Sequence, residues 1–167
     1  QNTRAAERAL EAGDAAIASM AFDQAAELLN LAKKLGDLSA EEDRIITLKL
    51  AEVLVNCGQG KKSADLYFLA AEGQGKEERL RCELLAGSQF LYAGYIEEGL
   101  QTMDKVMADI GETIPKTTRA ALVSLLWNRL KLKLRGHKWK KRKESRIPPG
   151  AMRRLDLFKV ISVSMST

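Results

Sequence analysis

The stretch GSQFLYAGYIEEGLQTMDKV, residues 87–106, decides the fold of this chain. Helix-forming residues stand on both sides of the turn signal AGY at residues 93–95. After the turn, Gly99, Met103 and Val106 are spaced by four and three residues, so they share one face of a helix. The stretch therefore predicts two helices that are joined by a tight turn and packed closely through small residues.

The same pattern occurs twice earlier in the chain. The two earlier copies are Ala25, Leu29 and Ala32, and Ala64, Phe68 and Ala71. Twelve residues before the three anchors Ala25, Ala64 and Gly99 stand Gly13, Glu52 and Gly87. The middle unit matches only in its second helix, because Glu52 replaces a small residue and Lys61 replaces the bulky Phe22 and Ile96. The anchors are 39 and 35 residues apart, which is close to the tetratricopeptide (TPR) period of about 34 residues.

One helical hairpin cannot bury its apolar face alone, so successive hairpins stack. We therefore expect an all-α, TPR-like superhelix of stacked antiparallel helix hairpins with about seven to eight helices; a generic amphipathic bundle is the alternative. Residues 1–115 are expected to form three degenerate TPR-like hairpins, and residues 116–167 to form C-terminal helices with a basic loop that pack on the array or continue it. The expected helices cover residues 3–19, 22–35, 39–57, 61–73, 76–93, 96–111, 118–135 and 151–165. Ser39 with Glu42 predicts a capping box, and Thr117 or Thr118 predicts a further helix start.

Charge is divided unevenly along the chain. Residues 1–115 hold 12 basic and 20 acidic residues, whereas residues 116–154 hold 14 basic residues and the single acid Glu144. No apolar run reaches the roughly 20 residues that a membrane span needs. Cys57 and Cys82 lack metal-ligand spacing and predict buried thiols in a reducing, cytoplasmic setting. The N-terminus has neither an initiator methionine nor a signal core, so we expect a segment of a longer protein.

No catalytic constellation is evident in the sequence. The one histidine, His137, stands in a basic stretch without a carboxylate neighbour. The run GQGKKS at residues 58–63 lacks the first glycine of a phosphate-binding loop, because Val55 occupies that position. We therefore expect neither an enzyme nor a bound metal or cofactor, and a protein or peptide ligand becomes the expected partner.

The first helices of TPR hairpins line a concave groove, and this property predicts the candidate peptide-binding residues. The groove residues are expected to be Lys49, Val53, Asn56, Arg81, Leu84 and Ser88. TPR domains that hold acidic chaperone tails resemble one another in a lysine and asparagine clamp. Here Val53 stands where the asparagine is expected, so capture of an acidic tail is not expected.

The basic stretch 129–146, with Trp127 just before it and Trp139 within it, allows two hypotheses. It could bind nucleic acid through phosphate contacts and base stacking. It could instead contact protein, either the acidic repeats or another domain of the parent chain. We favour protein because no defined nucleic-acid reading element is present. The candidate patch comprises Arg135, Lys138, Lys140, Lys141, Arg142 and Lys143.

The C-terminal part carries a more specific resemblance. Its motifs are Gly94-Tyr95, Ile114-Pro115, Arg119-Ala120-Ala121, Leu132-Lys133-Leu134-Arg135-Gly136, Ile147-Pro148-Pro149 and Leu155-Asp156. They resemble the helical region of large bacterial serine/threonine protein kinases that are fused to a STAND- or AAA-like ATPase module. The resemblance implies a regulatory, protein-binding array in a cytoplasmic signalling protein. No nucleotide loop or catalytic motif of a kinase occurs in these 167 residues.

Overall fold

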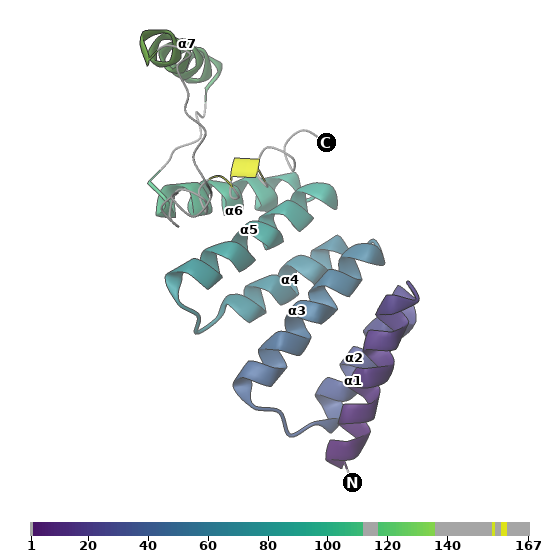
Figure 1. Cartoon of the computed structure of the whole chain (residues 1–167). Coiled ribbons are helices and arrows are strands. Elements are labelled where there is room, and N and C mark those ends of the chain that lie inside the picture. Colours follow the sequence, from purple (N-terminus) through teal and green to yellow (C-terminus); the bar gives the residue numbers. More distant parts are fainter. Residues whose placement is uncertain (1, 112–116, 136–154, 156–157, 160–167) are drawn as a thin grey trace.

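The chain was analysed as a computed structural model, which describes residues 2–111, 117–135, 155 and 158–159 (Figure 1). Within these residues the fold is all-helical, as the sequence predicts, and contains no strand. The helices are α1 Asn2–Ala18, α2 Phe22–Leu35, α3 Ala40–Asn56, α4 Gly60–Ala71, α5 Lys76–Tyr92, α6 Ile96–Asp109 and α7 Thr118–Arg135. They agree with the first seven predicted helices. The predicted helix 151–165 lies outside the described residues, apart from Leu155, Phe158 and Lys159.

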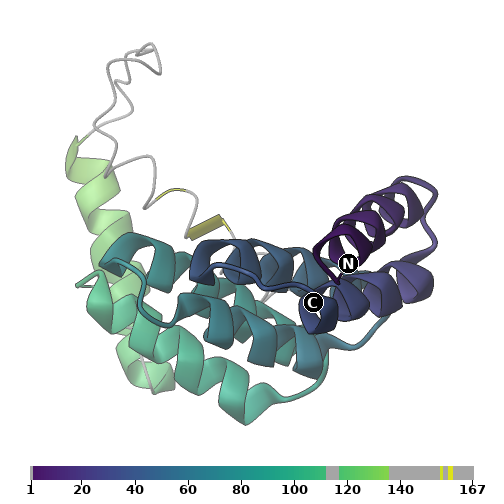
Figure 2. The ribbon, with the colours of Figure 1, turned by 90° about the horizontal axis from the view of Figure 1, so that it is seen from below.

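Helices α1 to α6 lie in chain order, and each packs against its sequence neighbour (Figures 1 and 2). Short turns join α1 to α2, α3 to α4, and α5 to α6. Each of these turns contains a left-handed residue: Met20 at φ 60°, Gly58 at φ 69° and Gly94 at φ 83°. The next residue in each turn donates a hydrogen bond to the carbonyl five positions back, from Ala21 to Ala16, from Gln59 to Leu54, and from Tyr95 to Phe90, at 2.8, 2.9 and 2.8 Å. The three turns are therefore equivalent.

These turns correct the register of the middle hairpin by one residue. The equivalent positions are Gly13, Ala25, Leu29 and Ala32 in the first hairpin, Ala51, Ser63, Tyr67 and Ala70 in the second, and Gly87, Gly99, Met103 and Val106 in the third. All twelve residues are buried. The anchors are thus Ala25, Ser63 and Gly99, at spacings of 38 and 36 residues. The sequence alignment placed Ala64 and Glu52 at these positions, one residue too late. It did so because Ala64 is small and buried, like its neighbour Ser63.

The corrected register restores the small residue that the middle hairpin seemed to lack. Ala51 is fully buried, whereas Glu52 and Lys61 are exposed. The Ser63 hydroxyl donates a hydrogen bond of 2.8 Å to the Ala51 carbonyl, which joins α4 to α3. Because small residues stand at both positions, the two helices of the hairpin can approach closely.

Contacts of the same kind occur in the outer hairpins. A Cβ atom added to Gly13 would lie 3.3 Å from the Leu29 side chain, and one added to Gly87 would lie 3.2 Å from the Met103 side chain. Leu29 and Met103 occupy the same position of their hairpins and have no exposed surface. In both outer hairpins, the large side chain of the second helix thus packs against the glycine of the first helix.

Two predicted helix caps are confirmed. The Ser39 hydroxyl accepts a hydrogen bond from the Glu42 backbone, and the Glu42 carboxylate accepts one from the Ser39 backbone, which together form the capping box of α3. At α7, the Thr117 hydroxyl accepts a hydrogen bond of 3.2 Å from the Ala120 backbone. Helix α7 differs from the other helices because none of its residues is buried. None of the described helices has the length and apolar character that a membrane crossing requires.

Candidate functional site

The predicted groove residues divide into buried and exposed groups. Val53, Leu84 and Ser88 are buried, so their side chains do not line a groove surface, contrary to the prediction. Val53 was predicted to face the groove because the middle hairpin was aligned one residue too late. The residue that faces outward at this turn of α3 is Glu52. Leu84 belongs to the core cluster with Met103, and the Ser88 hydroxyl donates a hydrogen bond of 3.0 Å to the Leu84 carbonyl.

The remaining predicted residues, Lys49, Asn56 and Arg81, lie at least partly at the surface. Lys49 Nζ lies 2.7 and 2.9 Å from the two carboxylate oxygens of Asp14, a pair that links α3 to α1. The Asn56 amide donates a hydrogen bond of 3.0 Å to the Glu52 carbonyl. We call the surface formed by Asp14, Lys49, Glu52, Asn56 and Arg81 the first-helix face, because α1, α3 and α5 each contribute to it.

Arg81 is the most accessible cation of the first-helix face. Its side chain is 71% exposed, and its guanidinium lies 3.7 Å from Glu78. Glu78 also lies 3.6 Å from Arg44, which links α5 to α3. Arg44 in turn holds the Glu41 carboxylate in two hydrogen bonds of 2.9 and 2.7 Å, and this contact lowers the pKa of Glu41. Charged pairs thus tie consecutive first helices together, while Arg81 stays available to a ligand.

A second charged cluster lies between α5 and α6. The Glu83 side chain is only 5% exposed, and its Oε1 atom lies 2.9 Å from Lys105 and 3.3 Å from Arg79. Arg79 also contacts Asp109 at 3.0 Å. Two cations therefore compensate a buried carboxylate, which is the requirement for keeping such a charge inside a fold. This pairing supports a structural role for Glu83.

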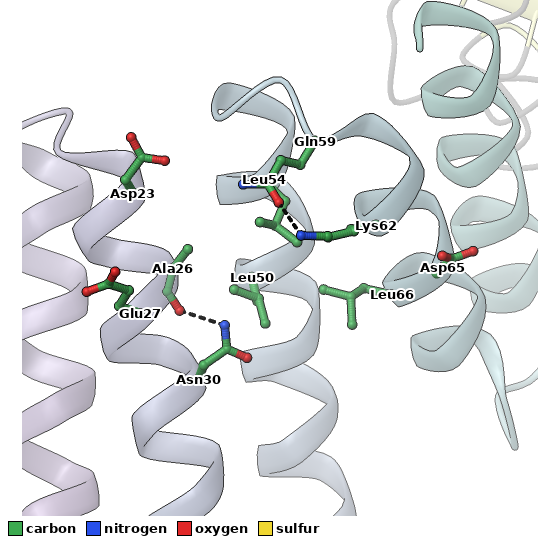
Figure 3. A pocket seen from close by; sticks show the side chains of 10 residues that line it. All are labelled: Asp23, Ala26, Glu27, Asn30, Leu50, Leu54, Gln59, Lys62, Asp65 and Leu66. Atoms are coloured by element: carbon green, nitrogen blue, oxygen red, sulfur yellow. Dashed lines mark hydrogen bonds between the residues drawn. The ribbon is translucent and has the colours of Figure 1, made fainter. Parts of the chain in front are cut away.

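A hollow of about 490 Å³ is lined by side chains of α2, α3, α4 and the α3–α4 turn (Figure 3). Its lining is Asp23, Ala26, Glu27, Asn30, Leu50, Leu54, Gln59, Lys62, Asp65 and Leu66. We call it the α2–α4 hollow. Sequence reasoning did not find it, because its walls come from three helices and depend on how these pack. The signal that was present is the apolar pair Leu50 and Leu54, which lies on the side of α3 opposite Glu52.

Acidic side chains stand on both walls of the α2–α4 hollow. Asp23 and Glu27 come from α2 and Asp65 from α4, and all three are exposed. The one cation of the lining, Lys62, donates a hydrogen bond of 2.8 Å to the Gln59 side chain. The hollow therefore has a net negative rim, and Leu50 and Leu54 at its base are almost completely buried members of the core.

Of the predicted basic patch, only Arg135 lies within the described residues. Lys138, Lys140, Lys141, Arg142 and Lys143 lie outside them. The described part of the chain contains no group of three or more Cys, His, Asp or Glu side chains that could hold a metal ion. Cys57 and Cys82 are free thiols; Cys82 is buried, as predicted, whereas Cys57 is only half-buried, so the prediction of burial is wrong for Cys57.

Comparison with protein-family models, with curated proteins and with solved structures finds no significant match.

Proposed function

We propose that this chain is a noncatalytic protein-binding scaffold, a TPR-like array whose stacked hairpins present the first-helix face to an extended peptide or a helix. The observation that carries the proposal is the equivalence of the three hairpins in turn geometry and in buried positions. Repeats of this kind create extended binding surfaces, because each hairpin adds another first helix to the same side.

The chemistry of the first-helix face supports a mixed polar and apolar ligand. Exposed Ile45 and Tyr92 lie on the same sides of α3 and α5 as Lys49 and Arg81, by helical spacing, whereas half-buried Leu10, Ile17 and Leu91 pack against the core. Arg81 adds an exposed cation, and the Asp14–Lys49 pair adds both signs of charge. A ligand with a few apolar anchors and at least one carboxylate would match these groups.

In keeping with the kinase resemblance, we propose that ligand binding biases catalytic domains elsewhere in a longer signalling protein. The alternative function is nucleic-acid binding through the basic C-terminal region. It is favoured by α7, which carries Arg119, Arg129, Lys131, Lys133 and Arg135 and no acid. Lys131 also lies 5.6 Å from the Trp127 ring centroid, so a cation and an aromatic ring are adjacent.

Affinity capture with the 167-residue chain tests the proposal, with and without nuclease and at two salt concentrations. A captured protein is then purified, and its affinity is measured for the unmodified chain, for Arg81→Glu and for Lys34→Glu, an exposed lysine of α2 that serves as the control. The proposal predicts that affinity falls about 10-fold or more only for Arg81→Glu. Partners that vanish with nuclease would instead favour the nucleic-acid alternative. Equal effects of the two variants would place the ligand on another surface.

A further inference from the structure

The outer side of α6 exposes apolar residues at positions that are covered in the other two hairpins. Leu100 is 41% exposed and Ile96 is 54% exposed. In the register defined by the turns, Leu100 is equivalent to Ala26 of α2 and Ala64 of α4, because each follows the anchor of its hairpin by one residue. Those two alanines are only 8% and 0% exposed. We call the surface formed by Ile96 and Leu100 the α6 end face.

In α2 and α4, the first helix of the following hairpin covers the equivalent surface. Ala26 belongs to one core cluster with two residues of α3, and Ala64 belongs to another with two residues of α5. These covering residues are Leu50 and Leu54 in α3, and Ala86 and Phe90 in α5. In each helix they stand one residue before and three residues after the small residue of the hairpin contact, Ala51 or Gly87. Stacking of successive hairpins therefore uses the same two positions each time.

Helix α7 follows α6 in the chain but lacks this pattern. The small residue is the twelfth residue of each first helix: Gly13 in α1, Ala51 in α3 and Gly87 in α5. The twelfth residue of α7 is Arg129, whose long charged side chain would keep a second helix at a distance. Helix α7 therefore does not have the sequence of a fourth first helix.

Residues 151–165, which the sequence predicts to be helical, carry the pattern that α7 lacks. The twelfth residue of this segment is the small Ser162. Ile161 stands one residue before it and Met165 three residues after it, at the two positions that α3 and α5 use to cover the preceding hairpin. In Figure 1, the parts of this segment that the structure describes, drawn in yellow, lie at the α6 end of the helix row.

We propose that residues 151–165 act as the first helix of a fourth hairpin and bind the α6 end face of their own chain. Ile161 and Met165 then pack against Leu100, as α5 packs against Ala64. Helix α7 belongs to the connection between α6 and this helix. The α6 end face is thus an interaction surface for an amphipathic helix, separate from the first-helix face, and the contact does not depend on a peptide ligand.

Hydrogen–deuterium exchange of the 167-residue chain tests this contact. Ile161→Asp places a charge against Leu100 and is expected to speed exchange of the α6 amides about 10-fold or more, because the last hairpin then opens more often. The matched control is Val160→Asp, because the equivalent residues Lys49 and Leu85 are partly exposed. It is expected to leave α6 exchange within about 2-fold. Unchanged exchange of the α1 and α2 amides in both variants establishes that the array stays folded.

Two further variants distinguish the occupants of the α6 end face. If Leu126→Asp on α7 speeds α6 exchange and Ile161→Asp does not, α7 is the bound helix and the inference is overturned. In a chain with Cys57→Ser, the pair Leu100→Cys and Ile161→Cys is expected to form a disulfide within one molecule, because such a bond needs closely placed backbones. A disulfide that joins two molecules would assign the α6 end face to a second copy and overturn the inference.

Discussion

Replacing Leu29 by alanine tests the packing that defines each hairpin. Leu29 lies in α2 with 0% of its surface exposed, and its side chain lies against Gly13 of α1. Glycine has no side chain that could move into the space left by the truncation, so most of the cavity would persist. Buried leucine-to-alanine changes of this kind destabilise proteins by about 3–4 kcal/mol, within a wider observed range. Two residues away, Leu31 is 44% exposed, and its truncation should lower stability by less than about 1 kcal/mol.

Urea unfolding followed by circular dichroism at 222 nm measures both changes. With a slope of about 2 kcal/mol per molar urea, Leu29→Ala should shift the unfolding midpoint downward by roughly 1.5–2 M, and Leu31→Ala by less than about 0.5 M. The slope itself should be compared, because repeat arrays can unfold hairpin by hairpin. If Leu29→Ala shifted the midpoint no further than Leu31→Ala, the argument that α1 and α2 pack through Gly13 and Leu29 would be refuted.

Three further predictions concern single groups. Ser39→Ala removes the capping box with Glu42 and should destabilise the protein by about 1 kcal/mol in the same urea assay, whereas no change would mean that the cap does not stabilise α3. Burial, and then the nearby Glu52 charge, raise the pKa of Tyr67 from about 10 to about 12. The folded state therefore keeps a proton that the unfolded state loses, and stability should fall as the pH rises from 10 to 12; absorbance at 295 nm should show a late-titrating tyrosine that is missing in Tyr67→Phe. Cys82 is buried and Cys57 is only half-buried, and burial raises the pKa of both thiols, so a thiol reagent should modify Cys57 first and Cys82 only on unfolding; equal rates would contradict this order.

The sequence was sufficient to predict the helices, because their signals are local. Strong helix formers fill the intervals between turns, and Gly58 and Gly94 mark two of these turns. The capping box at Ser39 follows from two residues three positions apart. Local chemistry of this kind decides where a helix begins and ends, whatever packs against it.

The register of the middle hairpin depended on packing and was predicted one residue too late. Ser63 and Ala64 are both small and both fully buried, so the spacing of small residues could not distinguish them. The hydrogen bond from Ser63 to the Ala51 carbonyl shows which residue occupies the hairpin contact. Aligning the left-handed turn position at Gly58 with that at Gly94 would have corrected the register from the sequence.

The candidate surfaces were harder to predict than the helices. The one-residue slip placed Val53 on the predicted groove, where the structure exposes Glu52. The α2–α4 hollow joins side chains that are as far apart in sequence as Asp23 and Leu66. Periodicity shows which side of one helix is apolar, but the space between helices depends on their mutual packing.

The equivalence of the three hairpins is tested most directly by placing leucine at two adjacent positions of α3 and measuring the free energy of unfolding. Ala51 has no exposed surface and lies in a core cluster with Tyr67, so Ala51→Leu should destabilise the protein by about 1–3 kcal/mol through overpacking. Glu52 is exposed, so Glu52→Leu should change stability by no more than about 0.5 kcal/mol. If Glu52→Leu were the more damaging of the two, the middle hairpin would not share the register of its neighbours.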